Sequence, residues 1–125
     1  MTEVAVGILQ KDNTYLICQR RRGGRYALQW EFPGGKVEPG ESIEQCLRRE
    51  LQEELSISIH SINHIHTEAA YYEDGGMFNV HYCDVSGFDG EPRNNVFEQI
   101  LWATLDELKT MDVLEGNKPF IAQLR

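Results

Sequence analysis

Runs of apolar residues separated by turn sequences predict a series of short β-strands. The runs at 4–9 and 14–18 flank Lys11-Asp12-Asn13, which is typical of a hairpin turn. Asp74-Gly75-Gly76 predicts a second hairpin turn further along the chain. The other strand-like runs are residues 57–59, 62–72, 77–85 and 101–103.

Helical patterns occur in three places. A helix is predicted over Ile43–Leu55, because Ser42 and Gln45 form a capping-box sequence just before an amphipathic run. The same kind of box opens a second, short helix predicted over 104–111. Residues 119–124 form the last predicted helix.

Two segments without periodicity separate these elements. Residues 20–25, with four arginines and two glycines, predict a basic and flexible loop. Pro33-Gly34-Gly35 predicts a break in regular structure before the long helix. Strands mixed with helices, in a chain of 125 residues, predict one layered α/β domain over residues 1–125.

The long helix carries acidic residues where a structural helix would be apolar. Its core face spans about 120° and is formed by Ile43, Leu47, Leu51 and Leu55. Glu54 falls inside this arc, Glu50 lies at its edge, and Glu53 lies further round. Like charges four residues apart repel, and they repel more strongly when they are removed from water. The cluster therefore needs a positive partner.

The positive partner favoured by the sequence is a metal ion. Arg49 can pair with Glu53 at four-residue spacing, but one guanidinium cannot neutralise three acids. A hard divalent cation with oxygen ligands, Mg²⁺ or Mn²⁺, suits such a cluster. The Gly-rich segment 34–41 enters the helix, and its backbone can approach a phosphate closely. From periodicity alone, a solvated acidic face stays open as the alternative.

Composition and charge narrow the classes of partner. Twelve basic and twenty acidic residues give a net charge of −8, which disfavours binding to duplex nucleic acid. No run approaches the roughly 18 to 20 apolar residues of a membrane helix, and the N-terminus lacks signal-peptide features. We therefore expect a cytoplasmic protein without a membrane partner. Cys18, Cys46 and Cys83 fit neither a disulfide framework nor a metal knuckle, and we expect them to be reduced.

The residues around the long helix resemble the Nudix box, GX5EX7REUXEEXGU. Gly35 is followed after five residues by Glu41, and after seven more by Arg49-Glu50-Leu51-Gln52-Glu53-Glu54-Leu55-Ser56-Ile57. Only Ser56 departs from the specified positions, where glycine favours a left-handed helix cap. This substitution affects the expected local geometry and leaves the expected ligand set intact.

The segment 31–41, which flanks the box at 35–57, resembles the MutT branch of the Nudix family. The resemblance implies an α/β/α sandwich around a mixed β-sheet. It also implies Mg²⁺-dependent hydrolysis, with Mn²⁺ as a substitute metal, of a nucleoside diphosphate linked to another group. For this branch we expect a nucleoside triphosphate, with 8-oxo-dGTP or a related deoxynucleotide as first choice, to be cleaved to a monophosphate and pyrophosphate.

The resemblance assigns roles to residues in and near the box. By position, the implied metal ligands are the Gly34 carbonyl and the carboxylates of Glu50, Glu53, Glu54 and Glu98. Arg49 is implied to orient these carboxylates, while Gly35 and Glu41 are implied to support the box.

The general base is expected on a loop before a strand that bears a tryptophan. Glu98 precedes Trp102 by four residues, two fewer than the family spacing, and is the residue expected to fill this role. Glu53 is the alternative.

Substrate-binding residues are implied outside the acidic cluster. They are Arg20, Glu31, Phe32, Phe78 and Asn117. Asn117 resembles the asparagine that reads an oxidised guanine, since an amide can donate and accept hydrogen bonds at once. The alternatives are that Asn117 caps the last helix, that Phe78 is a core residue, and that the basic loop is merely solvated.

Other functions stay open at this point. Trp30, directly before Glu31, resembles the branch that hydrolyses CTP and modified pyrimidine triphosphates. ADP-ribose and dinucleotide polyphosphates are further candidate substrates. A non-catalytic nucleotide sensor is a different class of function, which the complete set of three box glutamates disfavours. A monomer and a homodimer are both compatible with the sequence.

Overall fold

The computed structural model describes all 125 residues. Its long helix coincides with the predicted one, and the ends of its two short helices lie within one residue of the predicted ends. The strands are β1 (Thr2–Ile8), β2 (Gln10–Lys11), β3 (Thr14–Gln19), β4 (Trp30–Glu31), β5 (Gly34–Lys36), β6 (Ser58–Ile59), β7 (Ile62–Tyr71), β8 (Met77–Val85), β9 (Phe88–Asp89) and β10 (Gln99–Thr104). The helices are α1 (Ile43–Leu55), α2 (Leu105–Thr110) and α3 (Lys118–Gln123), the last preceded by the 3₁₀ turn η1 (Glu115–Asn117).

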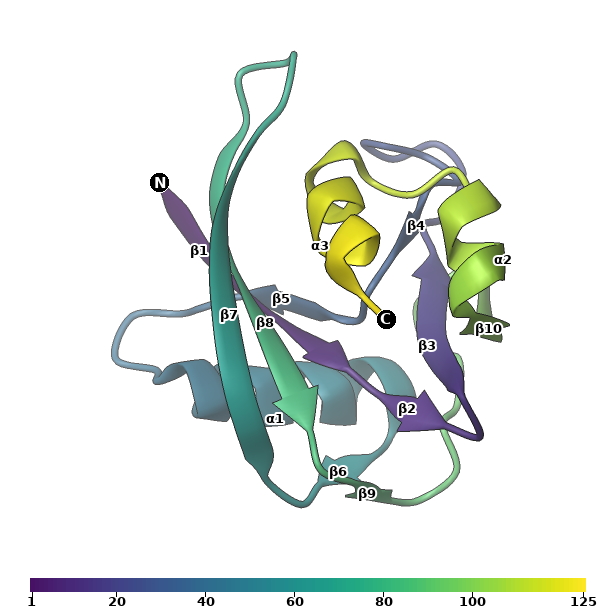
Figure 1. Ribbon diagram of the computed structural model, residues 1–125. Helices are drawn as coiled ribbons and strands as arrows, with labels where there is room; N and C mark the ends of the chain where they lie inside the picture. Colours follow the sequence, from purple (N-terminus) through teal and green to yellow (C-terminus); the bar gives the residue numbers. More distant parts are fainter.

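The strands form two four-stranded sheets, of which the one with the longer strands is called the main sheet, and a third sheet of two strands (Figure 1). The main sheet has the order β5-β1-β8-β7, in which β1 runs parallel to β8 and the other neighbours are antiparallel. The second sheet has the order β10-β3-β2, and β4 also pairs with β3. The third consists of β6 and β9. The predicted α/β class with a mixed sheet is confirmed.

Local sequence signals account for the turns and helix starts. Asp12 and Asn13 both have positive φ, as a tight hairpin between β2 and β3 requires. In α1 the Ser42 hydroxyl accepts from the Gln45 backbone N–H, and the Gln45 side chain accepts from the Ser42 backbone N–H. Thr104 makes the corresponding box with its N3 glutamate at the start of α2. Both predicted capping boxes are confirmed.

The predicted break at Pro33-Gly34-Gly35 is present at Pro33, between β4 and β5, but is wrong at the two glycines, because Gly34–Lys36 forms strand β5 against β1. The two strands approach so closely that a Cβ on Gly34 would lie 2.0 Å from the Ala5 carbonyl oxygen. Glycine is therefore needed here for strand pairing, where the sequence pattern indicated an interruption. The short strands β2, β4 and β9 were likewise not predicted, since each consists of two residues held by pairing alone.

Two apolar clusters lie on opposite faces of the main sheet. Alternate residues of β1 point to different clusters, Ala5 towards α1 and Val6 towards α2 and α3. The α1 face is buried at Leu47, Leu51 and Leu55 as predicted. Helices therefore cover the sheet on both sides, with α1 on one face and α3 on the other (Figure 1).

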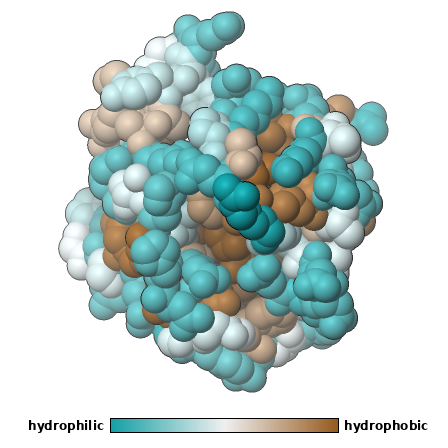
Figure 2. Space-filling model, in the orientation of Figure 1, coloured by the Kyte–Doolittle hydropathy of each residue, from teal (hydrophilic) through white to brown (hydrophobic).

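The three cysteines are buried and free, as predicted. Hydrophobic residues show at the centre of one face, beside hydrophilic side chains that dominate the rim (Figure 2). None of the helices combines the length and apolar character that crossing a bilayer requires.

Ser56 keeps the backbone conformation that glycine would favour. Its φ of 56° and ψ of 38° are left-handed, as is usual for the residue that ends a helix. The Asn95 side chain donates to the Ser56 hydroxyl at 2.9 Å and to the Glu53 carbonyl at 3.0 Å. The backbone N–H groups of Arg93 and Asn95 donate to the last carbonyls of α1. The side chain of Ser56 thus helps to tie this segment to the helix end.

Comparison of Ser56→Gly with Ser56→Ala separates these two effects. Both variants lose the hydroxyl. Alanine, like serine, has a Cβ that makes the left-handed conformation cost about 1 kcal/mol of folding free energy, whereas glycine adopts this conformation without that cost. We expect Ser56→Gly to unfold at a higher urea concentration than Ser56→Ala, by that free-energy difference. Equal unfolding midpoints would show that the left-handed conformation is not maintained at Ser56.

Candidate active site

The first glycine of the box allows α1 to carry a carboxylate directly against strand β5. A Cβ on Gly35 would lie 2.4 Å from the carboxyl carbon of Glu50 and 2.6 Å from both of its oxygens. Any larger residue would therefore displace this carboxylate. Gly35 thus has the supporting place in the box that the sequence implied.

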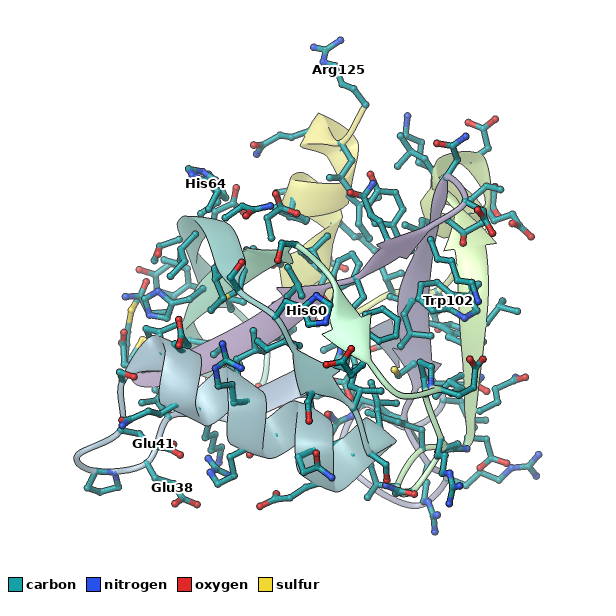
Figure 3. All side chains as sticks on the ribbon, turned by 90° about the horizontal axis from the view of Figure 1, so that it is seen from below. Glu38, Glu41, His60, His64, Trp102 and Arg125 are labelled. Carbon is teal, nitrogen blue, oxygen red and sulfur yellow. The ribbon has the colours of Figure 1, made fainter.

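Arg49 joins the glycine-rich loop to the acidic face of α1. Its Nε and Nη2 donate to the two oxygens of Glu41 at 2.7 and 2.9 Å, and its Nη1 donates to Glu50 at 2.8 Å. Glu41 also accepts from the backbone N–H of Glu38 at 2.9 Å. The Arg49 hydrogen bonds and the Glu38 N–H together lower the pKa of Glu41 to about 2. Figure 3 shows Glu38 and Glu41 side by side where this loop meets α1.

The predicted Arg49–Glu53 pair is present but is the weaker contact. Its N–O distance is 3.6 Å, and the Glu53 side chain is 59% exposed. Arg49 is drawn towards the closer carboxylates of Glu41 and Glu50, which are each 16% exposed. Glu53 therefore lies in solvent at the edge of the cluster.

Glu54 is the desolvated member of the cluster, as its place in the apolar arc predicted. Its Oε1 accepts from the backbone N–H of Gly34 at 3.0 Å, which links α1 to β5. Burial, reinforced by the negative charge of Glu50, raises the pKa of Glu54 to about 8 despite this hydrogen bond. Burial also raises the pKa of Glu50, against the opposing effect of Arg49.

The donor set fits a hard divalent cation. Carboxylate oxygens gather beside a backbone that approaches closely at Gly34 and Gly35, and the charge of Glu54 has no guanidinium or ammonium partner. The carboxylates are not drawn together, however: no three acidic, histidine or cysteine side chains converge on one point. Glu50 is held by Arg49 and Glu53 extends into solvent, so these two would have to turn to share an ion with Glu54.

Glu98 lies apart from this arrangement. It directly precedes β10, and its carboxylate makes one loose ion pair, 3.9 Å from Nε of Arg22. It lines neither of the two main cavities. The structure therefore does not bring Glu98 into contact with the box carboxylates.

A cavity of about 320 Å³ extends from Glu54 between the main sheet and the C-terminal segment. Its lining residues are Val4, Val6, Arg20, Arg25, Tyr26, Glu31, Phe32, Gly34, Gly35, Lys36, Glu54, Tyr72, Phe78, Val80, Leu114 and Asn117. All five residues implied to bind substrate are among them. The cavity thus combines apolar walls with a few polar groups, as small-molecule sites commonly do.

Arg20 and Glu31 form an ion pair inside this cavity. Nη1 of Arg20 lies 3.1 Å from both carboxylate oxygens of Glu31, whose side chain is 19% exposed. Burial raises the pKa of Glu31, while Arg20 counteracts the shift. The ion pair therefore places a guanidinium and a carboxyl group side by side on the cavity wall.

Asn117 is buried with its amide held in a definite orientation. Tyr82 donates its hydroxyl hydrogen to the Gly116 carbonyl at 3.1 Å, and so accepts from Nδ2 of Asn117 at 3.0 Å. The amide oxygen has no partner within the protein, and Asn117 lines the cavity. The alternative that its side chain caps the last helix is wrong, because α3 has no side-chain cap.

The two phenylalanines differ in their surroundings. Phe32 is 1% exposed and packs edge-to-face against Tyr82 and Phe120, so it belongs to the core as well as to the cavity wall. Phe78 is half-buried and packs edge-to-face against Tyr72. Phe78 therefore has the freer ring in the cavity.

A contact that the sequence did not reveal closes one side of the cavity. The carboxylate of Asp74, in the β7–β8 turn, accepts from the Tyr26 hydroxyl at 2.6 Å and from Nε of Arg25 at 2.8 Å. The Tyr26 ring packs on Tyr72 with 5.0 Å between centroids. These hydrogen bonds, that of Tyr26 first, lower the pKa of Asp74 to about 2. No local signal joins residues 48 and 49 positions apart.

The high pKa of Glu54 predicts that the metal-free protein loses stability as the pH rises. Because the pKa in the folded state is above the ordinary value of 4.5, the folded state binds more protons than the unfolded state between pH 4.5 and about 8. Glu54→Gln should therefore be near neutral at pH 5 and stabilising by on the order of a few kcal/mol at pH 8. Thermal unfolding in chelator at both pH values measures the difference.

Glu44→Gln is the matched control, since it removes an exposed charge from the same helix outside the cluster. If Glu54→Gln and Glu44→Gln have the same effect at pH 5 and pH 8, the carboxylate of Glu54 is not desolvated in the folded protein.

Comparison with known proteins shows the family to which this chain belongs. The chain matches the NUDIX domain over residues 1–124. It is 32% identical over 124 residues to the 8-oxo-dGTP diphosphatase of Escherichia coli strain K12, with 98% of this chain and 95% of that protein covered. It is 34% identical over 121 residues to the CTP pyrophosphohydrolase of the same strain, with 97% and 89% covered.

Solved structures give the same result. The solution structure of the E. coli ORF135 protein superposes with a TM-score of 0.85 at 30% identity, covering 98% of this chain and 86% of that one. The crystal structure of a MutT Nudix hydrolase from Burkholderia pseudomallei gives a TM-score of 0.89 at 24% identity, covering 99% and 98%. This chain, with its box intact except at Ser56, belongs to the Nudix hydrolase family.

Proposed function

We propose that the protein is a Mg²⁺-dependent nucleoside triphosphate pyrophosphohydrolase that releases a nucleoside monophosphate and pyrophosphate. The observation that carries this proposal is that a desolvated box carboxylate, Glu54, lines the same cavity as Arg20 and Asn117. Such a cavity can hold a metal-bound phosphate at one end and a base at the other.

The box residues are the proposed metal site. Glu50, Glu53 and Glu54, with the Gly34 carbonyl, would hold Mg²⁺ or Mn²⁺, and Glu98 would join them if its loop moved closer. When bound, such an ion screens the charge of the phosphates and lowers the pKa of a water molecule. Arg49 fixes the direction of Glu50 and, through Glu41, the loop that faces it.

The proposed general base is Glu98, with Glu53 as the alternative. In support of Glu98, the adjacent Phe97 lines a second cavity together with Glu54, so this segment borders the site. In support of Glu53, its carboxylate is exposed and already belongs to the cluster. Arg20, held in the first cavity by Glu31, is the proposed phosphate ligand.

We propose 8-oxo-dGTP as the first-choice substrate, because of the way Asn117 presents its amide. With Nδ2 turned to Tyr82, the free Oδ1 can accept from a base N–H, and the second Nδ2 hydrogen can donate to an adjacent carbonyl. An oxidised guanine offers N7–H beside O6, whereas guanine offers an acceptor at N7 that Oδ1 would repel. The 8-oxo-dGTP diphosphatase of E. coli, a relative over nearly the whole chain, supports this choice.

CTP is the second candidate substrate. Trp30 beside Glu31 favours it, and the CTP pyrophosphohydrolase of E. coli is related to this chain at a similar level of identity, 34%. The cytosine amino group is also a donor that Oδ1 of Asn117 can accept from. A direct comparison of substrates is therefore part of the test below.

Removing one box carboxylate tests the proposed metal dependence. Hydrolysis should stop in chelator and return with Mg²⁺ or Mn²⁺. Glu53→Gln keeps the volume but removes the charge, and we expect kcat to fall by at least about a hundredfold. Calorimetric titration of Mn²⁺ should show weaker binding in the same variant. Glu44→Gln on the same helix is the control and should keep both properties; full turnover in chelator would refute the proposal.

Substitution at Asn117 tests the proposed substrate. Loss of a paired buried amide costs about 1–3 kcal/mol per hydrogen bond. Asn117→Ala should therefore lower kcat/KM for 8-oxo-dGTP roughly tenfold to a hundredfold, with a much smaller effect on dGTP. Tyr82→Phe keeps Asn117 but frees its amide to rotate. This variant should also reduce the ratio of kcat/KM for 8-oxo-dGTP to that for dGTP, but by less than Asn117→Ala does.

The wild-type protein provides the deciding comparison. If it hydrolyses CTP or dCTP with a higher kcat/KM than 8-oxo-dGTP, the oxidised-guanine assignment is wrong and the Trp30 resemblance gives the substrate class instead. An inactive wild type that still binds nucleotides with Mg²⁺ would favour a sensor.

A further inference from the structure

A second cavity, of about 290 Å³, lies beside the first and differs from it in character. Its lining residues are Arg20, Arg21, Arg22, Gly24, Arg25, Glu31, Glu54, Val96 and Phe97. Only two of them are hydrophobic, against eight of the sixteen that line the first cavity. The second cavity is therefore suited to a charged group and poorly suited to a base.

Four residues line both cavities. They are Arg20, Arg25, Glu31 and Glu54. Glu54, the desolvated carboxylate of the box, thus lies where the cavities adjoin. A ligand bound at Glu54 can extend into the apolar cavity on one side and into the arginine-lined cavity on the other.

The arginines of this cavity differ in whether a carboxylate pairs with them. Arg20 is paired with Glu31 at 3.1 Å, and Arg25 is paired with Asp74 at 2.6 Å. Arg22 makes only a 3.9 Å contact with Glu98 and is 78% exposed at its side chain. Arg21 is exposed and makes no ion pair with any carboxylate of the chain. Arg21 and Arg22 therefore carry the free positive charge of the cavity.

The loop holds these two arginines while leaving them room to move. Backbone hydrogen bonds from Arg20 to the Gln29 carbonyl, at 2.9 Å, and from Leu28 to the Arg20 carbonyl, at 3.0 Å, close its base. Arg25 fixes its far side to Asp74. The stretch 21–24 between these anchors contains two glycines with open space around them. The exposed side chains of Arg21 and Arg22 can thus turn towards a ligand while the two ends of the loop stay anchored.

We propose that the second cavity binds the terminal phosphates of a nucleoside triphosphate through Arg21 and Arg22. This inference rests on the proposed function, in which one water is added across a P–O–P bond and the terminal phosphates leave as pyrophosphate. The base occupies the first cavity, the phosphate next to the cleaved bond lies at Glu54, and the tail lies among the arginines. Guanidinium groups suit this task, since each can bind two phosphate oxygens at once.

The charge of the whole protein makes such a site necessary for a polyphosphate tail. With a net charge of −8, the chain repels a polyanion, yet four of its twelve basic residues fall within residues 20–25. All four line this one cavity. A local concentration of positive charge in a cleft raises the local concentration of an anion. The preference for a triphosphate over a diphosphate is then a property of this loop.

Binding of inorganic pyrophosphate tests the site directly. We expect Arg21→Gln/Arg22→Gln to weaken pyrophosphate binding by about tenfold or more in calorimetric titration with Mg²⁺ present. Lys11→Gln/Lys109→Gln is the matched control, because it removes two exposed positive charges that line neither cavity. The control should bind pyrophosphate as the wild type does. Equal affinities of the two double variants would overturn the proposal.

Comparing the kinetics of a nucleoside triphosphate with those of its diphosphate tests whether the terminal phosphates bind at Arg21 and Arg22. The arginine double variant should raise KM for a nucleoside triphosphate about tenfold relative to the control, and raise KM for the corresponding diphosphate by less, because a diphosphate has only one phosphate beyond the cleaved bond. An equal rise for both nucleotides would mean general attraction rather than a tail site, and would also overturn the proposal. If the wild type hydrolyses no nucleotide, the proposed function fails, while the pyrophosphate titration still decides whether this site exists.

Discussion

The burial of the Glu54 carboxylate at the joint between α1 and β5 is the constraint on which the arrangement of the site depends. A carboxylate on the core face of a helix costs free energy, and the structure offsets only part of that cost with the Gly34 N–H. The two strands β5 and β1 must approach closely to place this N–H, so glycine is required at Gly34. Glycine is required at Gly35 for another reason, because a Cβ there would clash with the Glu50 carboxylate of α1. The remaining imbalance of charge is what a bound cation would remove.

Strands of the main sheet form the walls of the cavity that begins at this contact between α1 and β5. Because β5 pairs with β1, and β1 with β8, side chains from all three strands line the space that begins at Glu54. The C-terminal segment closes it with Asn117, whose amide is oriented by Tyr82 from β8. A carboxylate, an apolar wall and a fixed amide are thus held by paired backbone, which limits their movement.

The sequence was sufficient to predict the elements and contacts that depend on residues close together in the chain. It was insufficient for those that depend on residues far apart in the chain. The capping box at Ser42 and the acidic face of α1 depend on residues three or four apart, so periodicity predicted them and placed Glu54 at the core. Strand β5 depends on pairing with β1 about 30 residues earlier, which no local pattern of Pro33-Gly34-Gly35 could report. The same holds for Asp74, which organises a loop 48 residues away, and for the Tyr82 contact that fixes Asn117.

Charges of opposite sign lie side by side at the boundary between the two cavities. This arrangement suits the site to bind a cation and a polyphosphate together. Glu31 and Glu54 lie beside Arg20 and Arg25 in both cavities. Carboxylates alone would attract a cation and repel a phosphate, and arginines alone would bind a phosphate without a metal. Together they suit a cation and a polyphosphate bound as a pair, because the carboxylates can hold the cation and the arginines can hold the phosphates in adjoining cavities. An acidic protein can then accept a polyanionic substrate without any change in its overall charge.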